Sequence, residues 1–343
     1  MKSTKQTRIL VVGPNWVGDM VMAQSLLIVL KQRDPDCLID VLAPAWTRPL
    51  LAHMPEVATA IEIPLRRGEL GIRKRYRFAR MLAHNAYDRA ILLPNSLTSA
   101  LIPFFAGIPV RSGYLGEQRW GLLTDIRRLD KVLLPQTVQR FVALGLDPDA
   151  TLPPHCPEPR LLVEATEIAQ VREKFALESD SAKVLGLCPG AEYGPAKRWP
   201  ERHYAALARA RIEQGWSVWL FGSAHDRQIC ARIDQASGAR CRNFAGLTSL
   251  NEAIALLSVT DQVVTNDSGL MHIAAALGKN LIALYGSSDP NFTPPLTRKA
   301  RMIRLKLPCS PCFKRECPLG HFRCMNDIDP QRVITGLDEA EIA

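Results

Sequence analysis

The chain of 343 residues has no stretch of about 18 consecutive apolar residues, the length that a helix needs to cross a bilayer. Its N-terminus, MKSTKQTRILVVG, carries basic residues but lacks the long apolar core and the small-residue cleavage site of a signal peptide. Charged residues make up 22% and hydrophobic residues 47%, a composition typical of a soluble globular protein. We therefore expect a cytoplasmic protein of about two domains.

Several nucleotide-binding and catalytic motifs are also absent. The chain has neither G-x-G-x-x-G nor G-x-x-x-x-G-K-[ST], which argues against a nicotinamide dehydrogenase and a P-loop kinase. The chain also lacks a Ser-His-Asp order and an H-E-x-x-H pattern, so the sequence indicates neither a hydrolytic triad nor a zinc protease. The Asp34-Pro-Asp36 and Asp147-Pro-Asp149 segments look like turns and not like a site for a metal-bound nucleotide sugar.

The net charge is +9, and the excess is uneven. Residues 1–150 hold 20 Lys and Arg against 13 Asp and Glu, and the densest basic cluster runs from Arg66 to Arg80. The cluster includes Arg73, Lys74 and Arg75. It suits a polyanionic partner, such as a phosphorylated glycolipid or an anionic membrane surface, and a solvated helix face is the alternative. No nucleic-acid-binding motif accompanies the charge, so we expect no nucleic-acid partner.

Buried strands alternate with helical segments in both halves of the chain. Strands are expected at 8–12, 37–42, 58–63, 89–93, 184–188, 217–221, 262–264 and 281–285. This alternation indicates βαβ units and parallel sheets, and the four prolines of residues 151–160 mark a linker. We predict two α/β domains with a cleft between them. The expected boundaries are 1–155 for the first domain, 156–180 for a linker and connecting helix, 181–328 for the second domain and 329–343 for a terminal helix.

Residues 265–290 predict a strand end, a tight loop, a helix and the next strand. The Asn-Asp-Ser-Gly sequence at 266–269 is turn chemistry, and Gly278 can cap the end of the helix. The loop places backbone N–H groups and a positive helix end beside Asp267 and His272, an arrangement that binds a phosphate. The alternative is that Asp267 and Ser268 merely cap the helix.

Two loops of the first domain end in polar residues at a predicted helix start. Ligands of open parallel sheets bind at the carboxyl ends of the strands, so such loops are candidates for a site. Asp19, after Gly18, is either a general base or the N-cap of the next helix. Asn95 and Ser96 either hydrogen-bond sugar hydroxyls or cap the helix that follows them.

The corresponding loop of the second domain is PGAEYGPAK at residues 189–197. It is rich in Gly and Pro and closes with Lys197 just before a predicted helix. A cation and helix dipoles that point the same way would stabilise the growing charge of a pyrophosphate leaving group. The alternative is a surface lysine next to Trp199, which would anchor the helix.

The nine cysteines fall into two groups. Five are scattered, mostly in apolar runs, and are expected to be small core residues. The other four, Cys309, Cys312, Cys317 and Cys324, follow the spacing C-x2-C-x4-C-x6-C, which in a cytoplasmic protein indicates a metal more than disulfides. A structural zinc site with His321 as a spare ligand is one interpretation. Reduced thiols in a loop are the other, and neither has a direct catalytic role.

Several of these segments, in order, resemble one family. They are GPNWVGDMVMAQSL, APAWTRPLL, LPNSLTSAL, CPGAEYGPAKRWP, FGS and TNDSGLMHIAAALGKNLIALYGSSDPNFTPP. Together they resemble the bacterial ADP-heptose–lipopolysaccharide heptosyltransferases of glycosyltransferase family 9. The resemblance runs from about residue 8 to residue 295, which is most of the chain.

The resemblance implies a GT-B fold, in which two Rossmann-like domains with parallel sheets face each other across a cleft. The N-terminal domain would bind the acceptor and the C-terminal domain ADP-heptose. The reaction would be an inverting, metal-independent transfer of L-glycero-D-manno-heptose to the lipopolysaccharide inner core, at the inner leaflet of the membrane. Within the family, we expect the first heptose on Kdo-lipid A to be the acceptor.

The family's functional residues map onto positions already singled out. Asp19 matches the catalytic base, Lys197 the lysine near the donor phosphates, and Asp267 the aspartate beside the donor. The phosphate-binding loop and helix start match Ser268, Gly269, Leu270 and His272. Glu192 and Tyr193 lie in the matching donor loop.

Two alternatives to this function remain. A family member could instead use Kdo-lipid A itself as its acceptor. A non-catalytic ADP-sugar-binding protein could keep the fold, but the presence of both Asp19 and Lys197 argues against it.

Overall fold

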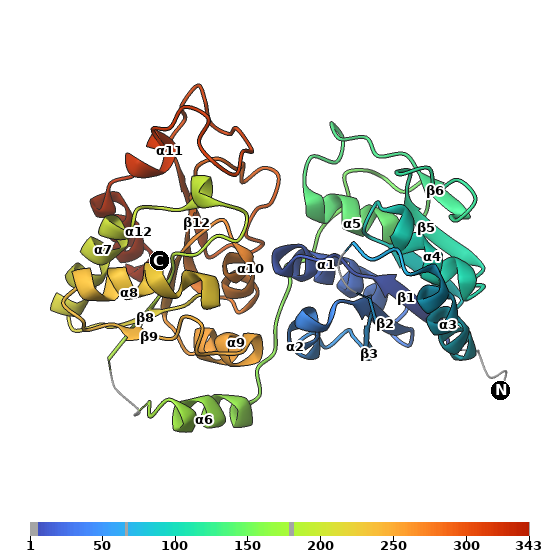
Figure 1. The fold of residues 1–343 in the computed structure, drawn as a ribbon, viewed down its shortest axis with the longest axis horizontal. Coiled ribbons are helices and arrows are strands. Elements are labelled where there is room, and N and C mark those ends of the chain that lie inside the picture. Colours follow the sequence, from blue (N-terminus) through green and yellow to red (C-terminus); the bar gives the residue numbers. More distant parts are fainter. Residues whose placement is uncertain (1–5, 66–67, 178–181, 343) are drawn as a thin grey trace. The chain divides into compact units, whose positions relative to one another are not determined.

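The computed structural model describes residues 6–65, 68–177 and 182–342. The chain divides into two compact units, residues 1–159 and 160–343 (Figure 1), and the division falls within the proline-rich stretch at 151–160. Each unit contains one six-stranded sheet, and every strand pair in the described residues is parallel. The expected α/β architecture with two parallel sheets is therefore confirmed.

The first sheet has the order β3-β2-β1-β4-β5-β6. Its strands are β1 (Arg8–Val12), β2 (Leu38–Ala43), β3 (Thr59–Glu62), β4 (Arg89–Leu92), β5 (Val110–Tyr114) and β6 (Asp125–Arg127). In the register of the central strands, Val12 lies opposite both Leu42 of β2 and Leu92 of β4. These apolar runs are buried on both faces of the sheet, as continuous hydrophobic strands of parallel sheets are.

Helices cover the first sheet in two packed pairs. The helices of this unit are α1 (Val17–Arg33), α2 (Arg48–Ala52), α3 (Ile72–Leu82), α4 (Leu97–Phe105) and α5 (Thr137–Gly145). α1 packs on α5, and α3 packs on α4. Leu10 and Val12 point into the same hydrophobic cluster as Ala79 and Leu82 of α3, because alternate residues of a strand face the same side.

The second sheet has the order β12-β11-β10-β7-β8-β9 and repeats the winding of the first. Its strands are β7 (Val184–Cys188), β8 (Ser217–Leu220), β9 (Arg242–Asn243), β10 (Gln262–Asn266), β11 (Asn280–Tyr285) and β12 (Ala300–Arg304). The helices are α6 (Ala165–Lys174), α7 (Glu201–Glu213), α8 (Arg227–Ala236), α9 (Leu250–Ser258), α10 (Gly269–Ala276), α11 (Arg323–Asn326) and α12 (Pro330–Ile342). α7 packs on both α8 and α12.

In each sheet the strand order reverses direction between two central neighbours. These neighbours are β1 and β4 in the first unit and β7 and β10 in the second. The connections that leave the carboxyl ends of such a pair run to opposite sides, which opens a crevice where ligands of this kind of sheet bind. Four of the loops singled out in the sequence follow these strands, at 13–16, 93–96, 189–200 and 267–268.

Some local predictions need correction. Asp19 was expected in the loop before a helix at residue 20, but α1 begins at Val17 and Asp19 lies in its first turn. The N-cap position belongs to Trp16, so the alternative role of Asp19 as N-cap is wrong. Of the five scattered cysteines, Cys37, Cys188 and Cys230 are buried, as expected of core residues. No helix in the described ranges combines the length and the apolar character needed to cross a bilayer.

Candidate functional site

Lys197 and Asp267 meet at the point in the second sheet where the strand order reverses. Lys197 ends a short 3-10 helix (Pro195–Lys197) in the loop after β7, and Asp267 directly follows β10. The Lys197 Nζ and an Asp267 carboxylate oxygen are 2.5 Å apart, and the Asp267 side chain is only 5% exposed. An ammonium has three N–H donors, so the carboxylate fixes the position of the cation and leaves donor capacity for a ligand.

Asn266 holds the loop of Lys197 against β10. Its side-chain oxygen accepts hydrogen bonds from the Trp199 backbone N–H at 3.0 Å and from the Tyr204 hydroxyl at 3.1 Å. Its amide nitrogen donates to the Pro189 carbonyl at 2.7 Å. The sequence pattern places Asn266 in the turn at 266–269 and gives it no role of its own, whereas in the structure it is the last residue of β10. No local pattern signals its long-range partners.

Trp199 anchors the same loop in the hydrophobic core. Its side chain is 1% exposed, and its indole N–H donates to the Ile328 carbonyl at 2.9 Å. Burying a side chain of this size stabilises a fold enough that its truncation typically costs about 3–5 kcal/mol. The anchoring role considered for Trp199 is thus present, and it coexists with the pairing of Lys197.

The N-terminus of α10 carries no side-chain cap. Ser268 occupies the N-cap position, but its hydroxyl makes no capping hydrogen bond and lies 3.3 Å from the Thr265 hydroxyl. Capping by Asp267 or Ser268 was the alternative to phosphate binding at this loop. Asp267 instead pairs with Lys197, so the N–H groups of the first turn, at Gly269 and Leu270, point out of the helix with the positive end of its dipole.

His272 lies in α10 and is 4% exposed. Burial lowers the pKa of His272 to about 4; the nearby Asp267 opposes this shift and the nearby Lys197 adds to it. The imidazole is therefore neutral at pH 7. His272 therefore adds no charge at the helix start, and the positive charge of this site comes from Lys197 and the helix dipole.

The other two donor-loop candidates have different surroundings. The Tyr193 ring lies under the Lys197 ammonium, with the Nζ 5.2 Å from the ring centroid, and the Tyr193 hydroxyl donates to the Phe313 carbonyl at 2.9 Å. Glu192 has a largely exposed side chain, 4.0 Å from the His225 ring. Tyr193 therefore belongs to the Lys197 environment, whereas Glu192 lies on the surface beside it.

A pocket of about 110 Å³ opens in the first unit at the carboxyl ends of its central strands. Its wall includes Val12 at the end of β1, Leu42 of β2, Pro94 after β4, and the side chains of Ser96 and Arg75. Asp19 follows this wall in the first turn of α1, where its side chain is partly exposed. The candidate base, in the first turn of α1, and the candidate acceptor residues of the 93–96 loop therefore lie at the same end of the sheet.

The buried side chain of Arg119 holds the loop that carries Asn95 and Ser96 in place by hydrogen bonds. The Arg119 guanidinium is fully buried and donates to the Pro94 carbonyl at 2.8 Å and to the Tyr114 carbonyl. Ser96 is the N-cap of α4 and accepts from the Ser99 N–H at 3.3 Å, so the capping alternative is correct for Ser96. Asn95 lies within 3.5 Å of Arg119.

The three basic candidates of α3 differ in their exposure. Arg73 is exposed, and Lys74 pairs with Glu69 at 2.6 Å. Arg75 is buried, and its guanidinium donates to the backbone carbonyls of Glu69, Leu70 and Thr98. Arg75 therefore supports the pocket wall instead of presenting a surface charge. Arg66 and Arg67 of the basic cluster lie outside the described residues.

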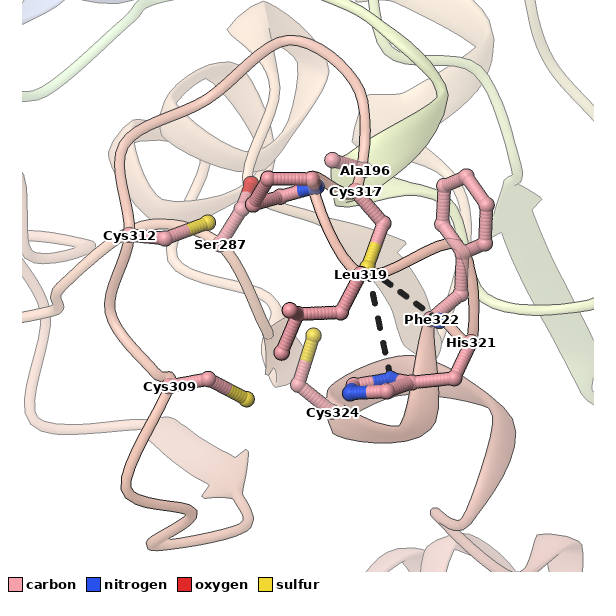
Figure 2. Close-up of a pocket in the computed structure, with 10 residues that line it drawn as sticks. Ala196, Ser287, Cys309, Cys312, Cys317, Leu319, His321, Phe322 and Cys324 are labelled. Carbon is pink, nitrogen blue, oxygen red and sulfur yellow. Dashed lines mark hydrogen bonds between the residues drawn. The ribbon is translucent and has the colours of Figure 1, made fainter.

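The four clustered cysteines line a small cavity beside the Lys197 loop (Figure 2). The cavity wall also includes Ala196, Ser287 and His321. All nine cysteines are free thiols, and no group of three or more His, Cys, Asp or Glu among the described residues is arranged to hold a metal ion. The zinc interpretation stays a prediction.

Comparisons with known proteins cover both units. Residues 75–323 match glycosyltransferase family 9 (heptosyltransferase). The chain is 49% identical over 340 residues to lipopolysaccharide heptosyltransferase 2 of Escherichia coli (strain K12), covering 96% of this chain and 97% of that protein. It is 47% identical over 344 residues to lipooligosaccharide heptosyltransferase 2 of Haemophilus influenzae, covering 96% and 98%. The solved structure of E. coli ADP-heptose lps heptosyltransferase II matches with a TM-score of 0.87 and 47% identity, covering 97% and 98%, which confirms the GT-B fold class.

Protonation of His272 should make the protein less stable in acid. The unfolded chain binds this proton near pH 6.5 and the folded chain only near pH 4, so stability falls as the pH drops through this window. His272→Gln should remove up to about 3 kcal/mol of that loss between pH 7 and pH 4, measured by urea unfolding. The exposed His84→Gln is the control and should follow the parent. Parallel pH profiles for parent and His272→Gln would contradict the assignment.

Proposed function

Because this chain belongs to glycosyltransferase family 9 (heptosyltransferase), we propose that it transfers L-glycero-D-manno-heptose from ADP-heptose to the first heptose of the lipopolysaccharide inner core. The acceptor in this proposal is heptosyl-Kdo-lipid A. Four relatives that are 46–50% identical over nearly the full chain are named heptosyltransferase 2, whereas a relative named heptosyltransferase 1 is only 27% identical, which favours this acceptor over Kdo-lipid A itself.

The observation that carries the proposal is the anion site at the carboxyl end of β10. Lys197 is held by Asp267 beside a helix start that no side chain caps. A cation and a helix dipole in one partly buried place attract a diphosphate strongly, because water screens them less there than at the surface. We assign this site to the diphosphate of ADP-heptose.

In the proposed reaction, a hydroxyl of the acceptor attacks the anomeric carbon of the donor heptose. The new glycosidic bond forms on the face opposite the bond to the diphosphate, so the configuration inverts. Asp19 takes the proton of the attacking hydroxyl as general base. The bond between the anomeric carbon and the diphosphate oxygen breaks, and ADP leaves with that electron pair.

The proposal divides the work between the two units. Lys197 and the backbone N–H groups at Gly269 and Leu270 stabilise the negative charge that grows on the leaving diphosphate. These donors are fixed before the reaction, so little reorganisation is needed as charge develops. No divalent cation is required in this scheme, since the protein supplies the positive charge itself.

The exposed part of α3 supports a membrane-facing role in the same proposal. Arg73 is exposed on this helix, and the exposed side chains of Ile72, Tyr76 and Met81 lie close to it in the sequence. Basic and apolar side chains together suit an anionic bilayer surface. We propose that α3 contacts the inner leaflet, where an acceptor rich in phosphates and carboxylates is presented.

Turnover should depend on Asp19. Asp19→Asn should lower kcat by about 10²–10⁴-fold, because the amide cannot take the proton, and should leave the Kd for ADP unchanged. The assay supplies ADP-heptose with heptosyl-Kdo-lipid A or with Kdo-lipid A, and follows ADP release and the mass of the product. The parent should use the first acceptor in preference to the second.

Asp36→Asn is the control for the loss of a carboxylate, because Asp36 is an exposed aspartate of the same unit. It should behave as the parent. Turnover of Asp19→Asn close to the parent rate would remove Asp19 as the base. Transfer to Kdo-lipid A alone would replace the proposed acceptor, and ADP binding without transfer to either acceptor would favour a non-catalytic ADP-sugar-binding protein.

The charge of Lys197 should control the affinity for ADP. Lys197→Gln should raise the Kd for ADP about 10-fold or more in calorimetry, because it removes a charge-assisted hydrogen bond to the diphosphate. The single variant also leaves the Asp267 carboxylate without its cation. The double variant Lys197→Gln/Asp267→Asn should recover stability through a neutral pair but should not recover ADP affinity.

A return of ADP affinity in the double variant would mean that Lys197 acts only on the structure of the loop. Lys299→Gln is the control for the loss of one positive charge, since Lys299 is exposed in the same unit. Its Kd for ADP should equal that of the parent.

Reversing the exposed charges of α3 should impair use of the acceptor. Arg73→Glu/Lys74→Glu should raise the KM for heptosyl-Kdo-lipid A in anionic vesicles and leave the Kd for ADP unchanged. Arg75 is left intact, because its buried guanidinium supports the backbone. Arg128→Glu/Lys131→Glu makes the same charge change on exposed residues of the same unit and is the control. Equal KM values for the two double variants would refute the role of α3.

A further inference from the structure

Residues 305–322, between β12 and α11, form an irregular segment with few apolar anchors: Leu305 and Leu307 pack at its start against the core of the second unit, and Phe313 contacts Phe292. The segment contains no helix or strand, and none of its side chains is fully buried. Phe313 and Phe322 adopt left-handed backbone conformations, with φ of 55° and 49°, which bulky residues rarely occupy. An irregular segment of this length without a core of its own needs another element to order it.

Four thiols of this region face one cavity of about 20 Å³ (Figure 2). Cys309, Cys312 and Cys317 belong to the segment, and Cys324 comes from α11. In Figure 2 their sulfur atoms point inward from different sides of the cavity. As these side chains stand, no three potential ligands in the described part of the chain are arranged to hold a metal ion. The cysteine side chains would have to rotate so that all four sulfur atoms surround one ion, each at the zinc–sulfur distance of about 2.3 Å.

Polar groups around the cavity favour a negatively charged sulfur centre. The Ser287 side chain lines the cavity at 1% exposure, and its hydroxyl has no hydrogen-bond partner among the described residues. The Phe322 backbone N–H donates to the Cys317 sulfur at 3.4 Å. Donors of this kind surround metal-bound thiolates and stabilise their charge. The surrounding sequence, residues 304–323, adds five Lys and Arg against one Glu.

Residues 305–322 make three hydrogen bonds to the loop of residues 189–200, which carries Lys197 and is called the donor loop here. The Arg315 carbonyl accepts from the Ala196 N–H at 3.0 Å, and the Arg315 Nε donates to the Tyr193 carbonyl at 2.7 Å. The Tyr193 hydroxyl donates to the Phe313 carbonyl. A side chain at Gly194 would meet the Arg315 carbonyl at 2.5 Å, so the two backbones are in close contact. The position of Lys197 therefore depends on the order of residues 305–322.

We propose that Cys309, Cys312, Cys317 and Cys324 bind one divalent metal ion of the zinc class in a tetrahedral thiolate site. Each thiol loses its proton on binding, and the charge of the centre is offset by the basic residues around it. The ion orders residues 305–322 and, through Arg315, fixes the donor loop. The effect on the donor loop rests on the function proposed above, whereas the metal site does not.

The metal content of the purified protein tests the site directly. Elemental analysis of the parent should give about one equivalent of zinc per chain. Cys312→Ser should lose most of it, and Cys241→Ser, a partly buried cysteine elsewhere in the same unit, should keep it. Exchange with Co²⁺ should give the strong visible absorption of a tetrahedral thiolate site. Iron at one equivalent would support the site with another metal.

Three results would overturn the site. Zinc and iron both well below one equivalent in the parent would do so, and so would an unchanged metal content in Cys312→Ser. A third such result is an intact mass that is lower than that of the reduced chain by two hydrogens per disulfide and that returns to the reduced value after reduction. It would show that the cysteines are crosslinked to each other. If Cys312→Ser does not fold, the parent's metal content and its Co²⁺ spectrum still decide the question.

Calorimetry with ADP tests the link to the donor loop. Arg315→Ala should keep the metal and weaken ADP binding severalfold, because it removes the bond to the Tyr193 carbonyl. The exposed Lys314→Ala, next to it in the sequence, should change neither. Unchanged ADP affinity in Arg315→Ala and in metal-depleted protein would overturn the link while leaving the metal site intact. A parent that binds metal but no ADP would contradict the proposed function and not the site.

Discussion

The side-chain amide of Asn266 is the interaction on which the candidate leaving-group site depends. It is fully buried at the end of β10, and it bonds the backbone of the 189–200 loop at both ends, through Pro189 and Trp199. Each bond contributes only about 1 kcal/mol net, but a buried amide left unpaired would cost more. The loop is therefore held in one path, and Lys197 within it is delivered to Asp267, the residue after Asn266. The hydrogen bonds of Asn266 thus fix the conformation of the loop, and the ion pair between Lys197 and Asp267 is a consequence of that conformation more than its cause.

The start of α10 lacks the stabilising side-chain cap that its N-cap residue could provide. A serine at an N-cap position usually accepts a backbone hydrogen bond, which contributes about 1 kcal/mol, yet Ser268 does not do so. The nearby carboxylate of Asp267 is also turned to Lys197. Both local groups that could satisfy the helix end are engaged elsewhere, which leaves its N–H groups for an anion. Departures of this kind from local rules are expected where a protein binds a ligand.

The apolar strands β1–β4, β7, β8, β10 and β11 were predictable from sequence, whereas the outer strands β5, β6, β9 and β12 and several site residues were not. Apolar runs located β1 and β7 to the residue. The start of α1 was missed, because the Gly and Pro of the preceding segment indicate a loop and Trp16 gives no capping signal. The burial of Arg75 was accessible in principle, since it shares a helix face with Ala79 and Leu82 at helical spacing. The bonds of Asn266 join residues 62 to 77 positions away, and no local pattern encodes such contacts.

The donor loop has two supports, and they differ in what they allow. Asn266 lies in the core of the second sheet, where a substitution would leave buried polar groups unpaired and weaken the whole unit. Arg315 lies on an exposed segment with no buried core of its own, so substitutions there change the loop without removing buried apolar area. In the proposed reaction, the Lys197 ammonium must be held in place before charge develops on the leaving group, and both supports contribute to that. Adjustment of the donor site by sequence change is therefore expected in residues 305–322, and conservation of its basic geometry in β10.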